Sequence, residues 1–190
     1  MNKSDSYSET ITKLADEWTI YFFKMNKEKK WIDNMKTIFT VDSVESFWGT
    51  LSHLKPVYEM SYGCDYYFFR KHIAPMWENE FNKNGGTWVI SSHKSKRHSE
   101  LDVIWIEVLM FLIGETMEED SNEICGAAVN IRGNYDKITV WTANSSNDES
   151  NKRIGLRLKS LLNLNRTIEY IPHAENINKT NFAVKPKLIV

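Results

Sequence analysis

A tryptophan and a carboxylate stand side by side in the middle of the chain, at Trp77 and Glu78. Pro75 disfavours helix at the residue before it, and the Asn-Gly-Gly run at 84–86 is typical of a turn. The sequence therefore predicts that Trp77 lies in a loop or on a hairpin arm. An indole face beside a carboxylate suits a flat aromatic ligand that stacks and donates hydrogen bonds from its edge, as guanine does. The alternative is that the ring folds back onto the core.

Trp31 is a second candidate for an exposed aromatic platform. It stands among Lys29, Lys30, Asp33 and Asn34, so the local sequence offers no apolar face for packing. Seven tryptophans in 190 residues is a high count, which favours aromatic recognition in addition to core packing.

Two cations flank a predicted hairpin turn. Strands are predicted over 125–132 and 136–142, which places Arg132 and Lys137 on opposite arms and close together. They form either a small anion clamp, sized for a short phosphate chain, or a solvated hairpin end. The formal net charge of −1 argues against a long basic surface, so phosphate binding would rest on a few focused cations.

The first predicted helix spans about residues 40–54. Asp42 is placed to cap it, and Glu45 stands three residues on to reach back. Its buried stripe leaves Val44 and Trp48 one turn apart on the shoulder. These two side chains form either the outer edge of the core, which the spacing alone favours, or the wall of an apolar groove.

The second predicted helix begins with Ser99 as its N-cap and ends before Gly114. Apolar residues nearly encircle it, so part of its surface must meet something besides the sheet. Ile106 and Met110 form a second apolar stripe with Glu107 beside them. Together with the spare edge of the first helix, this stripe suggests a docking surface for a partner helix, with core overlap as the alternative.

The remaining elements indicate one domain. Further strands are predicted over 18–23, 65–69, 86–90 (entered from a hairpin turn) and 167–171, a third helix over 153–162, a loop over 172–179, and a strand or tail over 182–190. Strands outnumber helices, which favours an antiparallel sheet with helices on one face.

Other features bound the function class. Two cysteines without metal-ligand spacing indicate a reduced, intracellular protein, and neither a signal peptide nor a membrane-spanning run is present, so a cytoplasmic or nucleocytoplasmic location is expected. The sequence has no Gly-rich phosphate loop, nucleophile elbow or His-Glu-x-x-His motif, so it is not expected to be an enzyme.

Several motifs recur in a familiar order. They include Trp18-x-x-Tyr-Phe-Phe, Phe47-Trp48, Pro75-Met-Trp77-Glu78, Gly85-Gly-x-Trp88, Trp105-x-Glu107, Val129-Asn-x-Arg132 and Trp141-Thr142. From about Leu14 to the C-terminus, the chain resembles the family of eukaryotic translation initiation factor 4E, the messenger-RNA cap-binding protein. The resemblance implies an α+β fold, with a flexible tail over 1–13 and a cap-binding domain over 14–190. That domain would be a curved, mainly antiparallel eight-stranded sheet with three helices on its convex face.

The resemblance also implies how the base of the cap would be held. Trp31 and Trp77 would sandwich 7-methylguanine, whose positive charge adds a cation–π contribution to stacking. Glu78 would accept hydrogen bonds from N1–H and the exocyclic amine, and Trp141 would pack near the methyl group. No cofactor or metal is implied.

Arg132 and Lys137 would hold the triphosphate bridge. Many members of the family carry an arginine at the position of Thr87 and a lysine at that of Asn134, so this chain has fewer cations there. Its grip on the triphosphate is expected to be weaker or differently arranged.

The implied partner surface lies on the convex back and consists of Val44, Trp48, Ile106, Glu107 and Met110. Its partner would be a scaffold initiation factor of the 4G type, or a 4E-binding protein, through a Tyr-x4-Leu-apolar helix. The implied function is cap binding with recruitment of the scaffold. The alternative is a cap-binding repressor or storage protein that does not recruit it.

Overall fold

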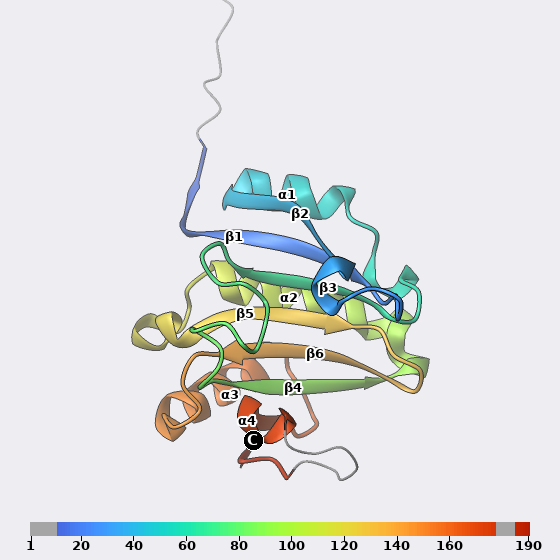
Figure 1. The fold of residues 1–190 in the computed structure, drawn as a ribbon. Helices are drawn as coiled ribbons and strands as arrows, with labels where there is room; N and C mark the ends of the chain where they lie inside the picture. Colours follow the sequence, from blue (N-terminus) through green and yellow to red (C-terminus); the bar gives the residue numbers. More distant parts are fainter. Residues whose placement is uncertain (1–10, 178–184) are drawn as a thin grey trace, which may run out of the picture.

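The computed structural model describes residues 11–177 and 185–190, so most of the predicted tail lies outside the described residues. Eight strands form one sheet in the order β2-β1-β3-β5-β6-β4-β7-β8, and all neighbouring pairs are antiparallel (Figure 1). The strands are β1 (Lys13–Lys24), β2 (Met35–Ser43), β3 (Cys64–Arg70), β4 (Gly86–His93), β5 (Ile124–Asn130), β6 (Tyr135–Thr142), β7 (Glu169–Pro172) and β8 (Leu188–Ile189). The α-helices are α1 (Val44–His53), α2 (Asp102–Ile113), α3 (Asp148–Leu161) and α4 (His173–Ile177).

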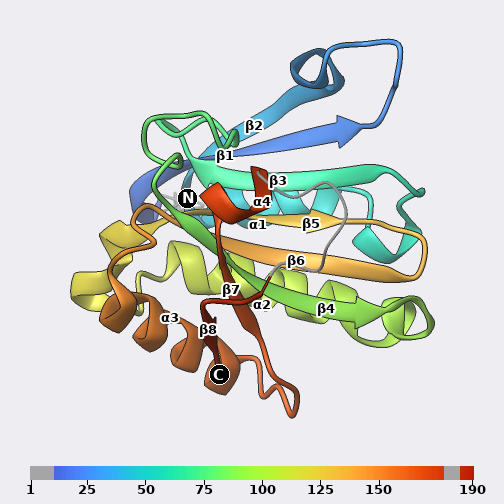
Figure 2. The same ribbon diagram turned by 60° about the horizontal axis from the view of Figure 1, so that its bottom comes forward.

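The helices divide between the two faces of the sheet. The helices α1, α2 and α3 cover the convex face, whereas the short α4 lies on the opposite, concave side (Figure 2). This arrangement confirms the predicted α+β fold of one curved sheet with three helices on its convex face. The prediction missed α4, which occupies part of the expected loop over 172–179.

Both faces of the central strands are apolar. In β3 every residue is buried, and successive side chains point to opposite faces. Phe68 stacks on Trp18 in the main core under the helices, with ring centroids 5.3 Å apart. Tyr67 and Phe69 face the other way and join Phe23 in a smaller cluster. That second cluster is the floor of the concave face.

The start of α1 differs from the prediction. Its N-cap is Ser43, whose hydroxyl accepts a hydrogen bond from the Ser46 N–H at 3.2 Å. Asp42 stands one residue before this N-cap, so the predicted capping by Asp42 was wrong, and the Glu45 carboxylate accepts from the Thr12 N–H at 3.0 Å. The strand β2 was not predicted, because its exposed residues break the strand-like alternation of apolar side chains.

The other helix starts were also misplaced. A π-helical turn over Arg97–Leu101 precedes α2, so Ser99 is not its N-cap, although the helix ends at Ile113, just before Gly114, as predicted. The helix α3 begins at Asp148, five residues earlier than predicted, with Asn147 accepting from the Ser150 N–H.

The strand β4 is not the hairpin partner of β3. It pairs with β6 and β7, so the segment 71–85 crosses from the middle of the sheet to β4, and the predicted hairpin entry was wrong. Trp88 of β4 is fully buried, as predicted, and its Nε1–H donates to the Asn151 carbonyl of α3 at 3.0 Å. The crossing therefore carries Trp77 over the concave face while β4 stays fixed to the core.

Candidate functional site

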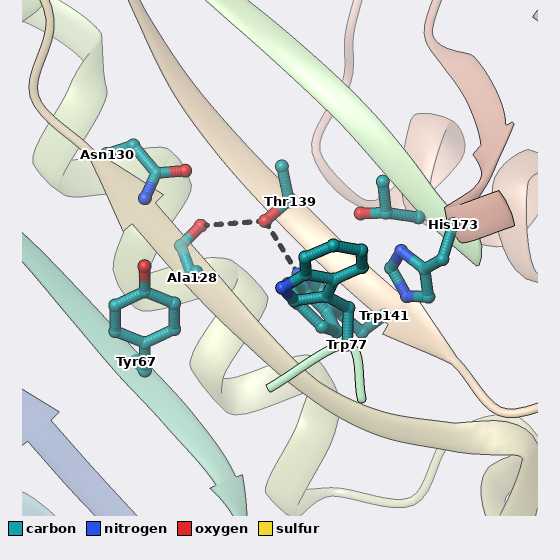
Figure 3. Close-up of a pocket in the computed structure, with 8 residues that line it drawn as sticks. Tyr67, Trp77, Ala128, Asn130, Thr139, Trp141 and His173 are labelled. Carbon is teal, nitrogen blue, oxygen red and sulfur yellow. Dashed lines mark hydrogen bonds between the residues drawn. The ribbon is translucent and has the colours of Figure 1, made fainter. Parts of the chain in front are cut away.

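A cavity of about 290 Å³ opens on the concave face of the sheet (Figure 3). Its walls come from β3, β4, β5, β6, α4 and the loop before β4. The lining residues are Tyr67, Trp77, Thr87, Ala128, Asn130, Thr139, Trp141 and His173. Half of these residues carry aromatic rings and most of the others add hydroxyl and amide groups, which is the composition of a site for a flat apolar ring with a polar edge.

Trp77 lies in a loop, as predicted, with its side chain 40% exposed. The loop is braced from inside by Asn82, which is fully buried. Its side-chain amide donates to the carbonyls of Ala74 at 2.9 Å and Met76 at 2.7 Å. One buried side chain therefore fixes the backbone on both sides of Pro75 and sets the direction in which Trp77 points.

Replacing Asn82 with alanine is expected to lower the free energy of unfolding by about 2 kcal/mol, because two partly buried carbonyls lose their donors. Chemical denaturation measures this change. Asn84→Ala, at an exposed position in the same loop, is the matched control and is expected to change stability by less than about 0.5 kcal/mol. Equal effects of the two substitutions would contradict a bracing role for Asn82.

Trp31 opens a 3₁₀-helix over Trp31–Asn34, in the connection between β1 and β2. Its side chain is 42% exposed. The ring packs on Phe23 at a centroid distance of 5.4 Å and edge-on against Tyr67 at 6.3 Å. Trp31 does not line the cavity, but Tyr67 does, so the two exposed indoles border the same region of the concave face.

Glu78 follows Trp77 in the loop and is exposed. It is not among the residues that line the cavity, so the structure places this carboxylate outside the apolar pocket. Trp141 lies within the cavity wall. Its ring packs edge-on against Phe69 at 5.3 Å, and its Nε1–H donates to the Thr139 hydroxyl at 3.2 Å (Figure 3).

His173 was missed by the sequence analysis. It is the first residue of α4, only 4% exposed, and its ring lies 4.5 Å from that of Trp141. Burial lowers the pKa of His173 to about 4, so the imidazole is neutral near pH 7. Its Nε2 has no hydrogen-bond partner among the described residues. No local pattern marked it, because the helix that carries it is only five residues long.

The buried imidazole predicts a loss of stability in acid. The pKa is about 4 in the folded state and 6.5 as its ordinary value, so between these pH values the unfolded chain binds the extra proton. His173 therefore destabilises the fold progressively as the pH falls from about 6.5 to 4, by about 2–3 kcal/mol in total. Denaturation at pH 7 and pH 4.5 tests this. His173→Gln is expected to flatten the dependence, whereas His98→Gln, at an exposed site, leaves it unchanged.

The two predicted phosphate-binding cations differ in their surroundings. Arg132 donates to both oxygens of the buried Asp65, at 2.5 and 3.0 Å, and this pairing raises the pKa of Arg132. Lys137 is exposed and makes no ion pair among the described residues. Asp65 was not predicted as a partner of Arg132, although a single acid in an otherwise aromatic strand indicates a buried charge that needs a partner. Thr87 is buried in the cavity wall, and Asn134 is exposed on the hairpin.

On the convex face, Trp48 is 46% exposed and rests edge-on against the buried Phe47 at a centroid distance of 5.1 Å. Met110 is exposed, and the side chains of Val44, Ile106 and Glu107 are half-buried. A cleft of about 140 Å³ separates α1 from α2, and Ile106 lines it. Trp48 is exposed but is not among the residues that line this cleft, so its place in a groove wall stays a prediction.

Comparisons with known proteins agree with this geometry. The family model described as eukaryotic initiation factor 4E matches residues 13–187. The chain belongs to this family. It is 43% identical over 179 residues to eukaryotic translation initiation factor 4E type 1B of Homo sapiens, covering 93% of this chain and 74% of that protein.

Solved structures of relatives share the fold. The structure of Ascaris suum eIF4E-3 with an m2,2,7G cap has a TM-score of 0.89 and 38% identity, covering 95% of this chain and 99% of that one. Schistosome eIF4E complexed with m7GpppA and 4E-BP has a TM-score of 0.90 and 32% identity, covering 96% of this chain and 100% of that one. The family consists of translation initiation factors and not of enzymes.

Three further observations concern the described residues alone. None of the described helices has the length and apolar character needed to span a membrane. Within the same part of the chain, no group of three or more His, Cys, Asp or Glu side chains is arranged to hold a metal ion. Cys64 and Cys125 are both buried and free.

Proposed function

We propose that this chain binds the 7-methylguanosine cap of mRNA on its concave face and recruits a translation-initiation scaffold through its convex back. The observation that most directly supports cap binding is that Trp77 and Trp141 line one cavity, with Trp31 exposed on the neighbouring loop. Relatives of similar fold are bound to cap analogues and to a 4E-binding protein, which supports both halves of the proposal.

The base is proposed to stack between Trp31 and Trp77. Each indole leaves about two fifths of its surface in water, so a flat ligand between them buries apolar area on both faces. Methylation at N7 makes the base cationic, and cation–π attraction then contributes about 1–2 kcal/mol for a desolvated face. Glu78 accepts from N1–H and the exocyclic amine in charge-assisted hydrogen bonds, while Trp141 and the neutral His173 line the space beyond.

The triphosphate is proposed to meet Lys137 and Arg132. Because Asp65 already binds two guanidinium nitrogens, Arg132 has a fixed position but part of its charge is offset. Lys137 contributes an exposed charge that is not paired within the described part of the chain. A shallow salt dependence for the cap alone follows from so few free cations.

The convex back is proposed to take an amphipathic helix of the Tyr-x4-Leu-apolar type, presented by a 4G-type scaffold or a 4E-binding protein. Trp48 and Met110 are its exposed apolar anchors, and the half-buried Val44, Ile106 and Glu107 complete the surface. Of these residues, Ile106 also lines the cleft between α1 and α2. The second candidate is a cap-binding repressor or storage protein that uses the same slot without the scaffold. A pulldown with scaffold peptides separates the two.

Titration with 7-methyl-GTP and with GTP, followed by tryptophan fluorescence, tests the cap-binding proposal. We expect strong quenching and at least about tenfold tighter binding of the methylated nucleotide, since only that base is cationic. Equal affinity for both nucleotides would reject the proposal.

The proposed location is cytoplasmic, and a second pool in the nucleus is the additional outcome. Imaging of a tagged chain would show whether the nuclear pool is present.

A further inference from the structure

Several connections gather at one end of the sheet. The segment between β1 and β2, the turn before β3 and the hairpin between β5 and β6 lie at the right-hand edge in Figure 1. Their backbones are joined by a short ladder: the Met25 N–H donates to the Gly63 carbonyl at 2.9 Å, and the Gly63 N–H donates to the Ile131 carbonyl at 3.0 Å. The three segments therefore form one continuous surface.

The β1–β2 connection is strongly basic. Within residues 24–36 there are five lysines and only two acids, Glu28 and Asp33, in a chain whose formal net charge is −1. Four of the lysines (Lys24, Lys27, Lys29, Lys36) line an open cavity of about 500 Å³, with Phe22 and Met25 in its wall. None of the four is ion-paired with another described residue, so their charges are available to an anion.

An exposed aromatic side chain stands beside this basic cavity. Tyr62 is 68% exposed, and the turn that presents it depends on Gly63, whose φ of 78° is a conformation that favours glycine. On one side the turn abuts Met25 of the cavity wall. On the other side the Tyr62 ring lies 3.9 Å from where a Cβ on Gly133 of the β5–β6 hairpin would stand.

The same surface leads back to the proposed phosphate site. Ile131 precedes Arg132, and two strand spacings of about 4.8 Å separate Ile131 from Met25 across the ladder. The lysine cavity therefore starts roughly 10 Å from the residue proposed to hold the triphosphate bridge. Tyr62 precedes Gly63, the middle residue of this ladder.

We propose that Tyr62 and the lysines of the β1–β2 connection bind the single-stranded RNA that follows the cap. The inference rests on the proposed cap-binding function and extends it to the next nucleotides of the message. Surfaces for single-stranded nucleic acid combine cations along the backbone with aromatic rings on which bases stack, and both are present here. An acidic peptide would use the lysines but would leave the exposed aromatic ring without a role.

The test compares a capped ten-nucleotide RNA with the cap dinucleotide alone, on the full chain. We expect the native protein to bind the capped RNA more tightly. Tyr62→Ala should reduce that gain by about tenfold, the effect of losing one base–aromatic stack, whereas Tyr62→Phe keeps it. In the Lys27→Gln/Lys29→Gln double variant, the slope of log affinity against log salt should fall by about 0.7 for each lost phosphate contact. Lys152→Gln/Arg157→Gln, on the exposed side of α3, is the matched control and leaves the slope unchanged.

The outcomes separate this inference from the function on which it rests. Failure to bind the cap dinucleotide rejects the proposed function and the RNA path with it. Binding of the dinucleotide with no gain for the capped RNA rejects the RNA path alone. A gain that neither Tyr62→Ala nor the double lysine variant reduces also rejects it. The RNA path is likewise rejected if a poly-glutamate peptide binds through the lysines while the capped RNA binds no more tightly than the cap dinucleotide.

Discussion

The Trp77→Ala variant is expected to lose binding to immobilised cap while keeping its fold intact. The lost base–indole stack is worth roughly 1–3 kcal/mol, and the cation–π contribution of the methylated base is lost with it, so affinity should fall at least about tenfold. Because Trp77 is on a loop and largely outside both apolar clusters of the sheet, the midpoint of thermal unfolding should move by no more than about 3 °C. Fluorescence titration and a thermal melt measure the two quantities.

The control for Trp77→Ala is a tryptophan of similar exposure on the other face. Trp48→Ala removes a ring that is 46% exposed but belongs to α1, so it should leave cap affinity unchanged. If the Trp77→Ala variant binds cap resin as strongly as the native protein does, Trp77 is not part of the proposed site. A large fall in its melting temperature would instead make it a core residue.

Trp48→Ala is in turn expected to abolish capture of a scaffold peptide. Exposed aromatic anchors at interfaces commonly cost 2 kcal/mol or more when truncated, which corresponds to a loss of about thirtyfold or more in affinity. The ring touches Phe47 at its edge, so a small loss of stability accompanies the change. Peptide binding by calorimetry and cap binding by fluorescence should therefore respond in opposite ways to the two tryptophan substitutions.

A different pattern would assign Trp48 to the core. In that case Trp48→Ala would lower the melting temperature and reduce both binding activities together. Met110→Ala, on α2, provides an independent check, because its exposed side chain contributes to the same proposed surface from another helix. If neither substitution weakens the peptide and the native chain does not bind it, the repressor or storage function gains support.

The sequence was most informative where pattern and packing agree. The hairpin of β5 and β6, the strand β3 and the buried face of α2 follow from alternation or helical spacing, since these elements bury one or both faces completely. The aromatic residues Trp31 and Trp77 were identified by the opposite signal, a large ring among polar neighbours. Both are partly exposed in the structure.

Features that depend on distant partners could not be predicted in this way. The capping of α1 by Ser43 depends on how far β2 extends, and that strand is set by its pairing with β1. His173 reaches the cavity only because β7 pairs with β4 and delivers α4 to the concave side. The pairing of Arg132 with Asp65 joins two strands far apart in the sequence, so the local hairpin pattern showed the cation without its partner.

The strand order has a consequence for the time course of synthesis. The cavity is lined by residues from Tyr67 of β3 to His173 of α4, so it is incomplete until α4 has been made. The strand β4 has no neighbour in the sheet until β6 is made, and it gains its second neighbour only with β7. At roughly 5–20 residues per second, a ribosome needs on the order of 10 s to make the intervening chain. Until β7 is made, the strand that carries Trp88 keeps at least one unpaired edge. A nascent chain of this kind depends on protection from aggregation until its last strands emerge.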